Sequence, residues 1–98
     1  MLSPEMSELA HTPKLGDSVI YYDDNRQPQA AIVVAVSSRI SAHTDRPICN
    51  LASWGPNGFS YCRRNVEPAR FDDSLQKWKL VNKWALPDEV PDSEWDYI

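Results

Sequence analysis

The chain has 98 residues, of which 42% are hydrophobic and 24% are charged, and its formal net charge is -4. This length and composition exclude a second independent core, a fully disordered chain and a fibrous repeat. Residues 14–70 carry seven basic and five acidic side chains, whereas residues 71–98 carry three basic and seven acidic ones. The acidic balance argues against general nucleic-acid affinity, which needs several uncompensated cations.

Residues 1–13 show neither helical nor strand periodicity, and Pro4 and Pro13 favour an extended N-terminal arm. The arm lacks the basic and apolar regions of a secretory signal. No apolar run in the sequence approaches the roughly 20 residues that cross a bilayer. We therefore expect a cytoplasmic protein that is not secreted and has no transmembrane segment.

The first strand is expected within residues 15–22, where β-branched and aromatic side chains come together. Residues 23–28 are polar, end in proline and predict a turn. The two segments therefore indicate a strand and the loop that follows it.

Residues 30–36 form the most apolar stretch, in which the bulky Ile32, Val34 and Val36 alternate with smaller side chains. Alternate residues of a strand point to opposite faces. We expect a central strand whose bulky face is buried. A polar loop is expected over residues 37–46.

The strongest local signal is the turn sequence Gly-Pro-Asn-Gly at residues 55–58, which lies between two alternating segments, 47–54 and 59–66. An Asn-Gly pair between such segments is typical of a β-hairpin. If this pair forms the centre of a two-residue turn, Trp54 lies opposite Tyr61 and the two share one face.

The reverse face of this hairpin would carry Cys49, Leu51, Cys62 and Val66, which would contribute to the core. Two cysteines are too few for a disulfide scaffold, and a reducing cytosol disfavours a bridge between them. We expect two buried free thiols.

Beyond Pro68, the spacing of Phe71, Leu75 and Trp78 is helical, whereas residues 78–80 alternate like a strand. A loop or single turn followed by a closing strand near residues 78–81 is the preferred interpretation. The segment Trp84 to Pro87 would then lead into the acidic tail.

Five short strands with tight turns predict a mainly β fold, either a small SH3-like barrel or a curled antiparallel sheet. The barrel domain is expected over residues 14–86. The arm of residues 1–13 precedes it, and an acidic-aromatic C-terminal tail of residues 87–98 follows it.

The sequence contains no persuasive catalytic or metal site. His43 lies in a polar segment and His11 in the arm, and neither has a nucleophile motif nearby. The two histidines and two cysteines show no knuckle-like spacing for zinc, and there is no glycine-rich phosphate loop. We expect a protein that is not an enzyme and that uses no metal or cofactor.

The hairpin offers a candidate binding face of aromatic and basic side chains, namely Trp54, Phe59, Tyr61, Arg63 and Arg64. Small β-barrels use such stacking and cationic groups to bind bases or peptides. Alternatively, the aromatics close the core and the arginines pair with carboxylates. The orientation of the side chains decides between these alternatives.

A second candidate lies in the tail, where Trp95, Tyr97 and Ile98 alternate with acidic residues. Such a peptide can add to a sheet as a strand or insert its aromatics into grooves. We expect it to dock either on the basic middle of its own chain or on a neighbour, although an acidic segment can also be a solvated tail.

Several turn and strand motifs recur together along the chain, namely Gly16 to Tyr22, Ala30 to Val33, Asn50-Leu51, Trp54 to Gly58, Asn65-Val66 and Trp84 to Pro87. In these motifs the chain resembles a group of small, mostly uncharacterised proteins of tailed bacteriophages and prophages that have an SH3-like barrel. The resemblance implies a phage origin and a location in the host cytoplasm or the virion, but it carries no established activity.

These features predict a non-enzymatic phage protein that acts by binding, foremost a virion-associated structural or decoration protein that docks on a larger protein assembly. The alternative is a host-directed inhibitor of host defence that binds a host protein or sequesters a small anionic nucleotide through Arg63, Arg64 and the aromatic face. A nucleic-acid-binding barrel comes third. A protein partner is expected, self-association into a homo-oligomer stays open, and neither a membrane nor nucleic acid is an expected partner.

Overall fold

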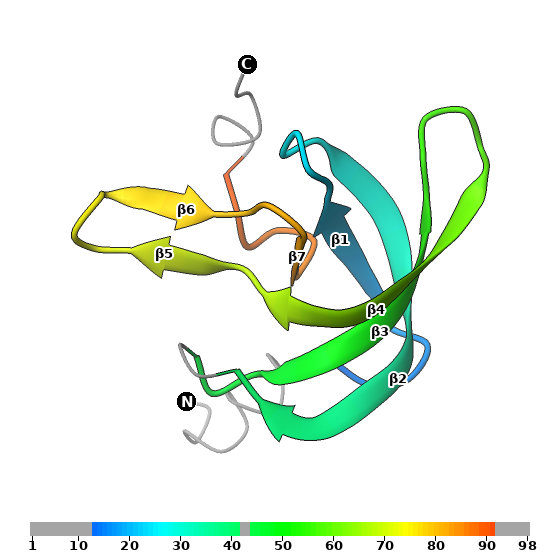
Figure 1. Cartoon of the computed structure of the whole chain (residues 1–98), viewed down its shortest axis with the longest axis horizontal. Helices are drawn as coiled ribbons and strands as arrows, with labels where there is room; N and C mark the ends of the chain where they lie inside the picture. Colours follow the sequence, from blue (N-terminus) through cyan, green and yellow to red (C-terminus); the bar gives the residue numbers. More distant parts are fainter. Residues whose placement is uncertain (1–12, 42–43, 92–98) are drawn as a thin grey trace, which may run out of the picture.

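A computed structural model of the chain describes residues 13–41 and 44–91 (Figure 1). Seven strands and no helix are found within these residues. They are β1 (Ser18–Tyr22), β2 (Pro28–Ile40), β3 (Pro47–Trp54), β4 (Ser60–Pro68), β5 (Arg70–Asp72), β6 (Lys77–Lys79) and β7 (Lys83–Ala85). No helix of the described residues is therefore long and apolar enough to cross a membrane.

Five strands close into a barrel in the order β1-β2-β3-β4-β7. All neighbours are antiparallel except β4 and β7, which pair in parallel. Strands β5 and β6 form a separate two-stranded hairpin that projects from the barrel (Figure 1). The expected mainly β fold with a small five-stranded barrel is confirmed, and it fits an SH3-like barrel.

The strand that closes the barrel is β7, and the expectation of a closing strand near residues 78–81 is wrong. Trp84 in β7 is fully buried, whereas Trp78 lies in the projecting hairpin and packs edge-on against Phe71 with ring centres 5.7 Å apart. The turn of this hairpin is held by Asp72, whose carboxylate accepts hydrogen bonds from Ser74 and Leu75. A local turn therefore pairs Trp78 with Phe71 and leaves Trp84 to close the barrel.

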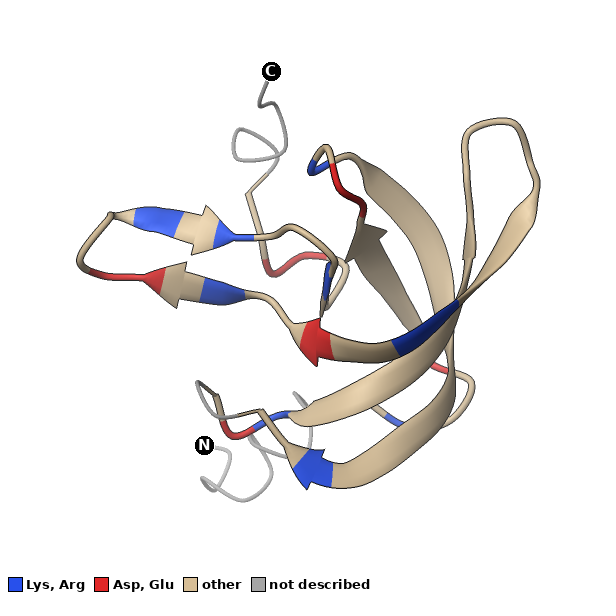
Figure 2. Cartoon of the chain, in the orientation of Figure 1, with Lys and Arg blue, Asp and Glu red and all other residues tan. Residues whose placement is uncertain are grey.

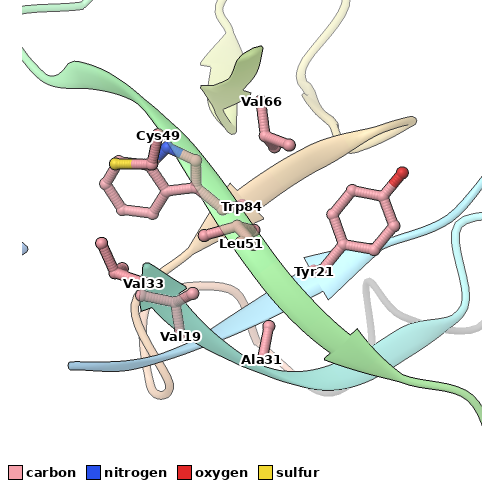
Figure 3. Packing of buried hydrophobic residues seen from close by; sticks show 8 residues of the cluster. All are labelled: Val19, Tyr21, Ala31, Val33, Cys49, Leu51, Val66 and Trp84. Atoms are coloured by element: carbon pink, nitrogen blue, oxygen red, sulfur yellow. The ribbon is translucent and has the colours of Figure 1, made fainter. Parts of the chain in front are cut away.

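The buried face of β2 is the opposite of the one expected. Ala31 and Val33 point into the core, whereas Ile32, Val34 and Val36 are 36%, 46% and 41% exposed. The interior of a five-stranded barrel is narrow, and large side chains from the other strands already fill it. Figure 3 shows this cluster, which contains Val19, Tyr21, Ala31, Val33, Cys49, Leu51, Val66 and Trp84.

The hairpin of β3 and β4 is confirmed, but its register differs by one residue from the expected one. Tyr61 pairs with Ser53, and Trp54 pairs with Ser60. The turn is closed by a hydrogen bond from the Gly58 N–H to the Gly55 carbonyl, so Pro56 and Asn57 are its central residues. Proline is favoured at the first central position of such a turn because its ring fixes φ near -65°. Gly58, which follows the two central residues, has a φ of 85°.

Both cysteines are free thiols, as expected, but only Cys49 is buried. The expectation that Cys62 belongs to the core is wrong, because the changed register turns it toward the outside, opposite Ala52. Val66 nevertheless reaches the core. A bulge between Cys49 and Leu51 restores the inward orientation after Arg64.

A second buried cluster extends the core past the barrel strands. Val90 is buried against Tyr22, Ala69, Leu80 and Ala85. Beside it, Arg46 and Glu89 form an ion pair with a nitrogen-to-oxygen distance of 2.6 Å. The chain is thus packed against the barrel as far as Val90.

Strand β2 is longer than expected. It runs to Ile40, so the loop that was expected over residues 37–46 is shorter.

Candidate binding surfaces

The structure does not bring the five candidate residues of the hairpin onto one face. Tyr61 and Arg63 share the face of β4 that pairs with the inward residues of β3, at the mouth of the barrel. Trp54 lies on the outer face and is 37% exposed, and Phe59 is 67% exposed in the turn. Arg64 is exposed as well. One surface of the hairpin therefore contains the arginine-tyrosine pair, and another contains the tryptophan.

Arg63 contacts the rings of two tyrosines, Tyr21 and Tyr61. Its guanidinium carbon lies 4.8 Å from the centre of the Tyr21 ring and 4.9 Å from that of Tyr61. Its Nε donates a hydrogen bond of 3.1 Å to the hydroxyl of the buried Ser53. Two ring faces and one hydrogen bond fix the plane of the guanidinium, which is the geometry of cation–π stacking.

Burial raises the pKa of the Tyr21 phenol, and the nearby charge of Arg63 partly opposes this rise. The phenol donates a hydrogen bond of 2.7 Å to the side-chain oxygen of Asn82. A protonated tyrosine donates this bond, and the raised pKa extends the pH range over which the phenol stays protonated. Tyr21 is thus a structural support of the stack.

A cleft of about 320 Å³ opens beside this stack. Asp23, Asp24 and Gln29 line it together with Arg63. Because two carboxylates face one guanidinium, the cleft does not favour an anionic ligand. The arrangement suits a polar, neutral or cationic group better than the anionic nucleotide of the alternative hypothesis, which rested on Arg63 and Arg64.

The outer face of the sheet is apolar and uncharged. We use the name outer face for Ala30, Ile32, Val34, Ala52, Trp54 and Cys62. The sequence has no charged residue in the stretches 27–38 and 47–62, which supply this face. In Figure 2, β2 and β3 are accordingly tan over almost their whole lengths. Contiguous apolar surface without charges is typical of an interface rather than of a solvated sheet.

A basic groove lies between the β5–β6 hairpin and the barrel, with a volume of about 500 Å³. Nine described residues line it: Arg26, Glu67, Arg70, Lys77, Trp78, Lys79, Leu80, Val81 and Lys83. Five of these are basic and one is acidic. Figure 2 shows the corresponding blue segments on β5, β6, β7 and the loop between β1 and β2.

Sequence reasoning missed this groove. Lys77 and Lys79 lie in a part of the chain whose overall balance is acidic, and Arg26 lies about fifty residues away in another loop. A signal was present in the alternation of Lys77, Trp78 and Lys79, which places two ammonium groups beside an indole. Arg70 joins them because it pairs with Lys79 in the local β5–β6 hairpin, whereas Arg26 reaches the groove only when the barrel closes.

The remaining candidates lie outside the described residues, namely Trp95, Tyr97 and Ile98 of the tail, as do His11 and His43. In the part of the chain that the structure describes, no group of three or more His, Cys, Asp or Glu side chains could hold a metal ion. No protein-family model matches the chain, and no curated protein or solved structure is significantly similar to it.

Proposed function

We propose that the chain is a non-enzymatic binding protein that docks on a larger protein assembly through its outer face. The observation that carries this proposal is the exposure of Ile32, Val34 and Trp54 on a sheet surface without charges. Burying such a surface against a partner releases water from apolar side chains, and no charged group has to be desolvated. Its composition therefore suits protein–protein contact.

The assembly proposed is the virion of a tailed bacteriophage, on which the chain would act as a structural or decoration protein. This part of the proposal rests on the resemblance of the turn and strand motifs to small phage proteins. A repetitive lattice would present the same docking site many times, so even a modest interface on each copy would suffice.

The test introduces one charge into the outer face and measures co-sedimentation of the purified chain with virions of the phage that encodes it. Val34→Glu should weaken binding at least tenfold, because the carboxylate would be buried in an apolar interface. Leu75→Glu is the matched control, since Leu75 is also an exposed apolar residue, at 51%, but lies in the β5–β6 turn. Circular dichroism checks that both variants fold.

Two results would contradict the proposal. In the first, mass spectrometry does not detect the chain in purified virions, and purified chain added to those virions does not bind them. The Val34→Glu variant could bind virions as tightly as the unmodified chain, and the outer face would then have no part in docking.

A second candidate function is favoured by the basic groove. In this function the chain is a host-directed inhibitor that sequesters a small anionic nucleotide. Lys77, Lys79 and Trp78 take the role that the alternative hypothesis gave to Arg63, Arg64 and the aromatic face. A thermal-shift panel of nucleotides tests it, because a ligand that binds the folded state raises the melting temperature. No shift with any nucleotide at millimolar concentration would eliminate this candidate.

A further inference from the structure

Four cations of the basic groove, Arg70, Lys77, Lys79 and Lys83, have few acidic partners among the described residues. Arg70 lies 3.8 Å from the carboxylate of Asp72, and Lys83 donates a long hydrogen bond of 3.5 Å to a backbone carbonyl. Among the described residues, neither Lys77 nor Lys79 forms an ion pair. A groove with this lining would lower its electrostatic energy by taking up a ligand that carries several negative charges.

The shape of the groove indicates an extended ligand rather than a single small ion. Its volume of about 500 Å³ is far larger than a phosphate needs, and its cations come from β5, β6, β7 and the loop after β1. Trp78 adds a half-buried indole to the lining. A peptide with spaced carboxylates and an aromatic side chain matches both features.

The chain itself contains such a peptide in residues 92–98, which lie outside the described residues. Their sequence is Asp-Ser-Glu-Trp-Asp-Tyr-Ile, with three carboxylates at alternate positions and two aromatic side chains between or beside them. In an extended peptide, this alternation gathers the three carboxylates on one side. Its charge and aromatic content therefore complement the groove.

The position at which this segment leaves the described structure also favours the groove. Val90 packs in the same buried cluster as Leu80, and Leu80 lines the groove. The ion pair of Glu89 with Arg46 holds the chain at a neighbouring cleft, which shares Arg70 and Trp78 with the groove. Seven extended residues span up to about 23 Å, a length equal to the width of roughly five adjacent strands.

We propose that residues 92–98 occupy the basic groove of their own chain, with carboxylates of this segment paired to Lys77 and Lys79. Tethering gives the segment an effective concentration on the order of millimolar, so weak pairing suffices to fill the groove. The segment thereby competes with any other acidic or anionic ligand for the same cations. This inference is independent of docking through the outer face.

The first test is zero-length carbodiimide cross-linking of the unmodified chain at micromolar concentration, followed by peptide mapping. Carboxylates of residues 92–96 should cross-link within the chain to Lys77 or Lys79. They should not cross-link to Lys14, an exposed lysine outside the groove lining. Cross-links found only between two chains, or distributed equally over all lysines, would overturn the proposal.

The second test uses a fluorescently labelled synthetic peptide of residues 92–98 and measures its anisotropy. In the full chain, the triple variant Asp92→Asn, Glu94→Gln and Asp96→Asn should bind the peptide at least tenfold more tightly than the unmodified chain, because its own segment no longer competes. Adding Lys77→Gln and Lys79→Gln to this variant should abolish the gain, whereas adding Lys14→Gln should not.

The same comparison of the triple variant with the unmodified chain is made with small anions as ligands. ATP and inorganic phosphate should bind the triple variant more tightly than the unmodified chain if the segment fills the groove. Equal affinity of the two proteins for the peptide, ATP and phosphate would show an open groove and would overturn the proposal. The Val34→Glu result does not affect these outcomes, so failure here is distinguishable from failure of the proposed function.

Discussion

The guanidinium of Arg63 lies 4.8 Å from the centre of the Tyr21 ring and 4.9 Å from that of the Tyr61 ring. Each cation–π contact of this kind contributes about 0.5–1 kcal/mol. Arg63→Met should therefore lower the free energy of unfolding by about 1–2 kcal/mol, as measured by urea denaturation. The neighbouring Arg64→Met is the control, because Arg64 is exposed, and it should change stability by less than about 0.5 kcal/mol.

The same substitution should shift the titration of Tyr21. The positive charge of Arg63 lowers the pKa of this phenol against the larger effect of burial, which raises it. Removing the charge in Arg63→Met should therefore raise the pKa further. Absorbance at the wavelength of tyrosinate follows the titration, and Tyr21→Phe identifies the contribution of this residue. An unchanged or lowered pKa would show that the guanidinium does not act on the ring.

The β3–β4 turn should depend on glycine at one position. Gly58 has a φ of 85°, in a region that side-chain-bearing residues rarely adopt. Gly58→Ala should cost about 1–2 kcal/mol of stability, whereas Gly58→Asn should cost less because asparagine tolerates the left-handed conformation. Thermal and urea unfolding measure both. Equal losses would indicate that steric contact rather than backbone conformation governs this position.

The two thiols should differ strongly in reactivity. Cys62 is exposed, whereas Cys49 is buried and its pKa is raised to about 11 by that burial. Because the thiolate is the reactive species, native protein at pH 8 should consume one equivalent of a thiol reagent quickly and the second only on unfolding. Cys62→Ser should remove the fast phase. Two fast equivalents would mean that the barrel opens readily around Cys49.

Burial of Cys49 should also make stability depend on alkaline pH. The pKa of this thiol is about 11 in the folded chain, compared with an ordinary value of 9.0. Between these values the unfolded chain loses a proton that the folded chain keeps. The contribution is therefore fully present below pH 9 and is lost as pH rises toward 11, on the order of 2 kcal/mol in all.

Urea unfolding at pH 8, 9.5 and 11 measures this loss. Cys49→Ala serves as the comparison, because tyrosines and lysines titrate in the same range and are common to both proteins. The variant should lose less stability with pH than the unmodified chain does. Parallel pH profiles for the two proteins would refute a role for Cys49.

Local sequence determined the β-hairpin of β3 and β4, the mainly β content and the absence of a disulfide. These features depend on neighbouring residues: the turn needs Pro56, Asn57 and Gly58 in succession, and each strand needs a run of β-branched or aromatic side chains. Even here a one-residue change in register inverted the faces of β4 next to the turn and moved Cys62 out of the core.

Only the tertiary structure decided which face of β2 is buried and which strand closes the barrel. Both faces of residues 30–36 are apolar, so the pattern contains no preference, and the limited space beside Trp84 and Leu51 selects Ala31 and Val33. The basic groove has the same origin. Arg26 and Lys77 lie about fifty residues apart in the sequence. Closure of the barrel brings their charges together, and no local sequence signal encodes that closure.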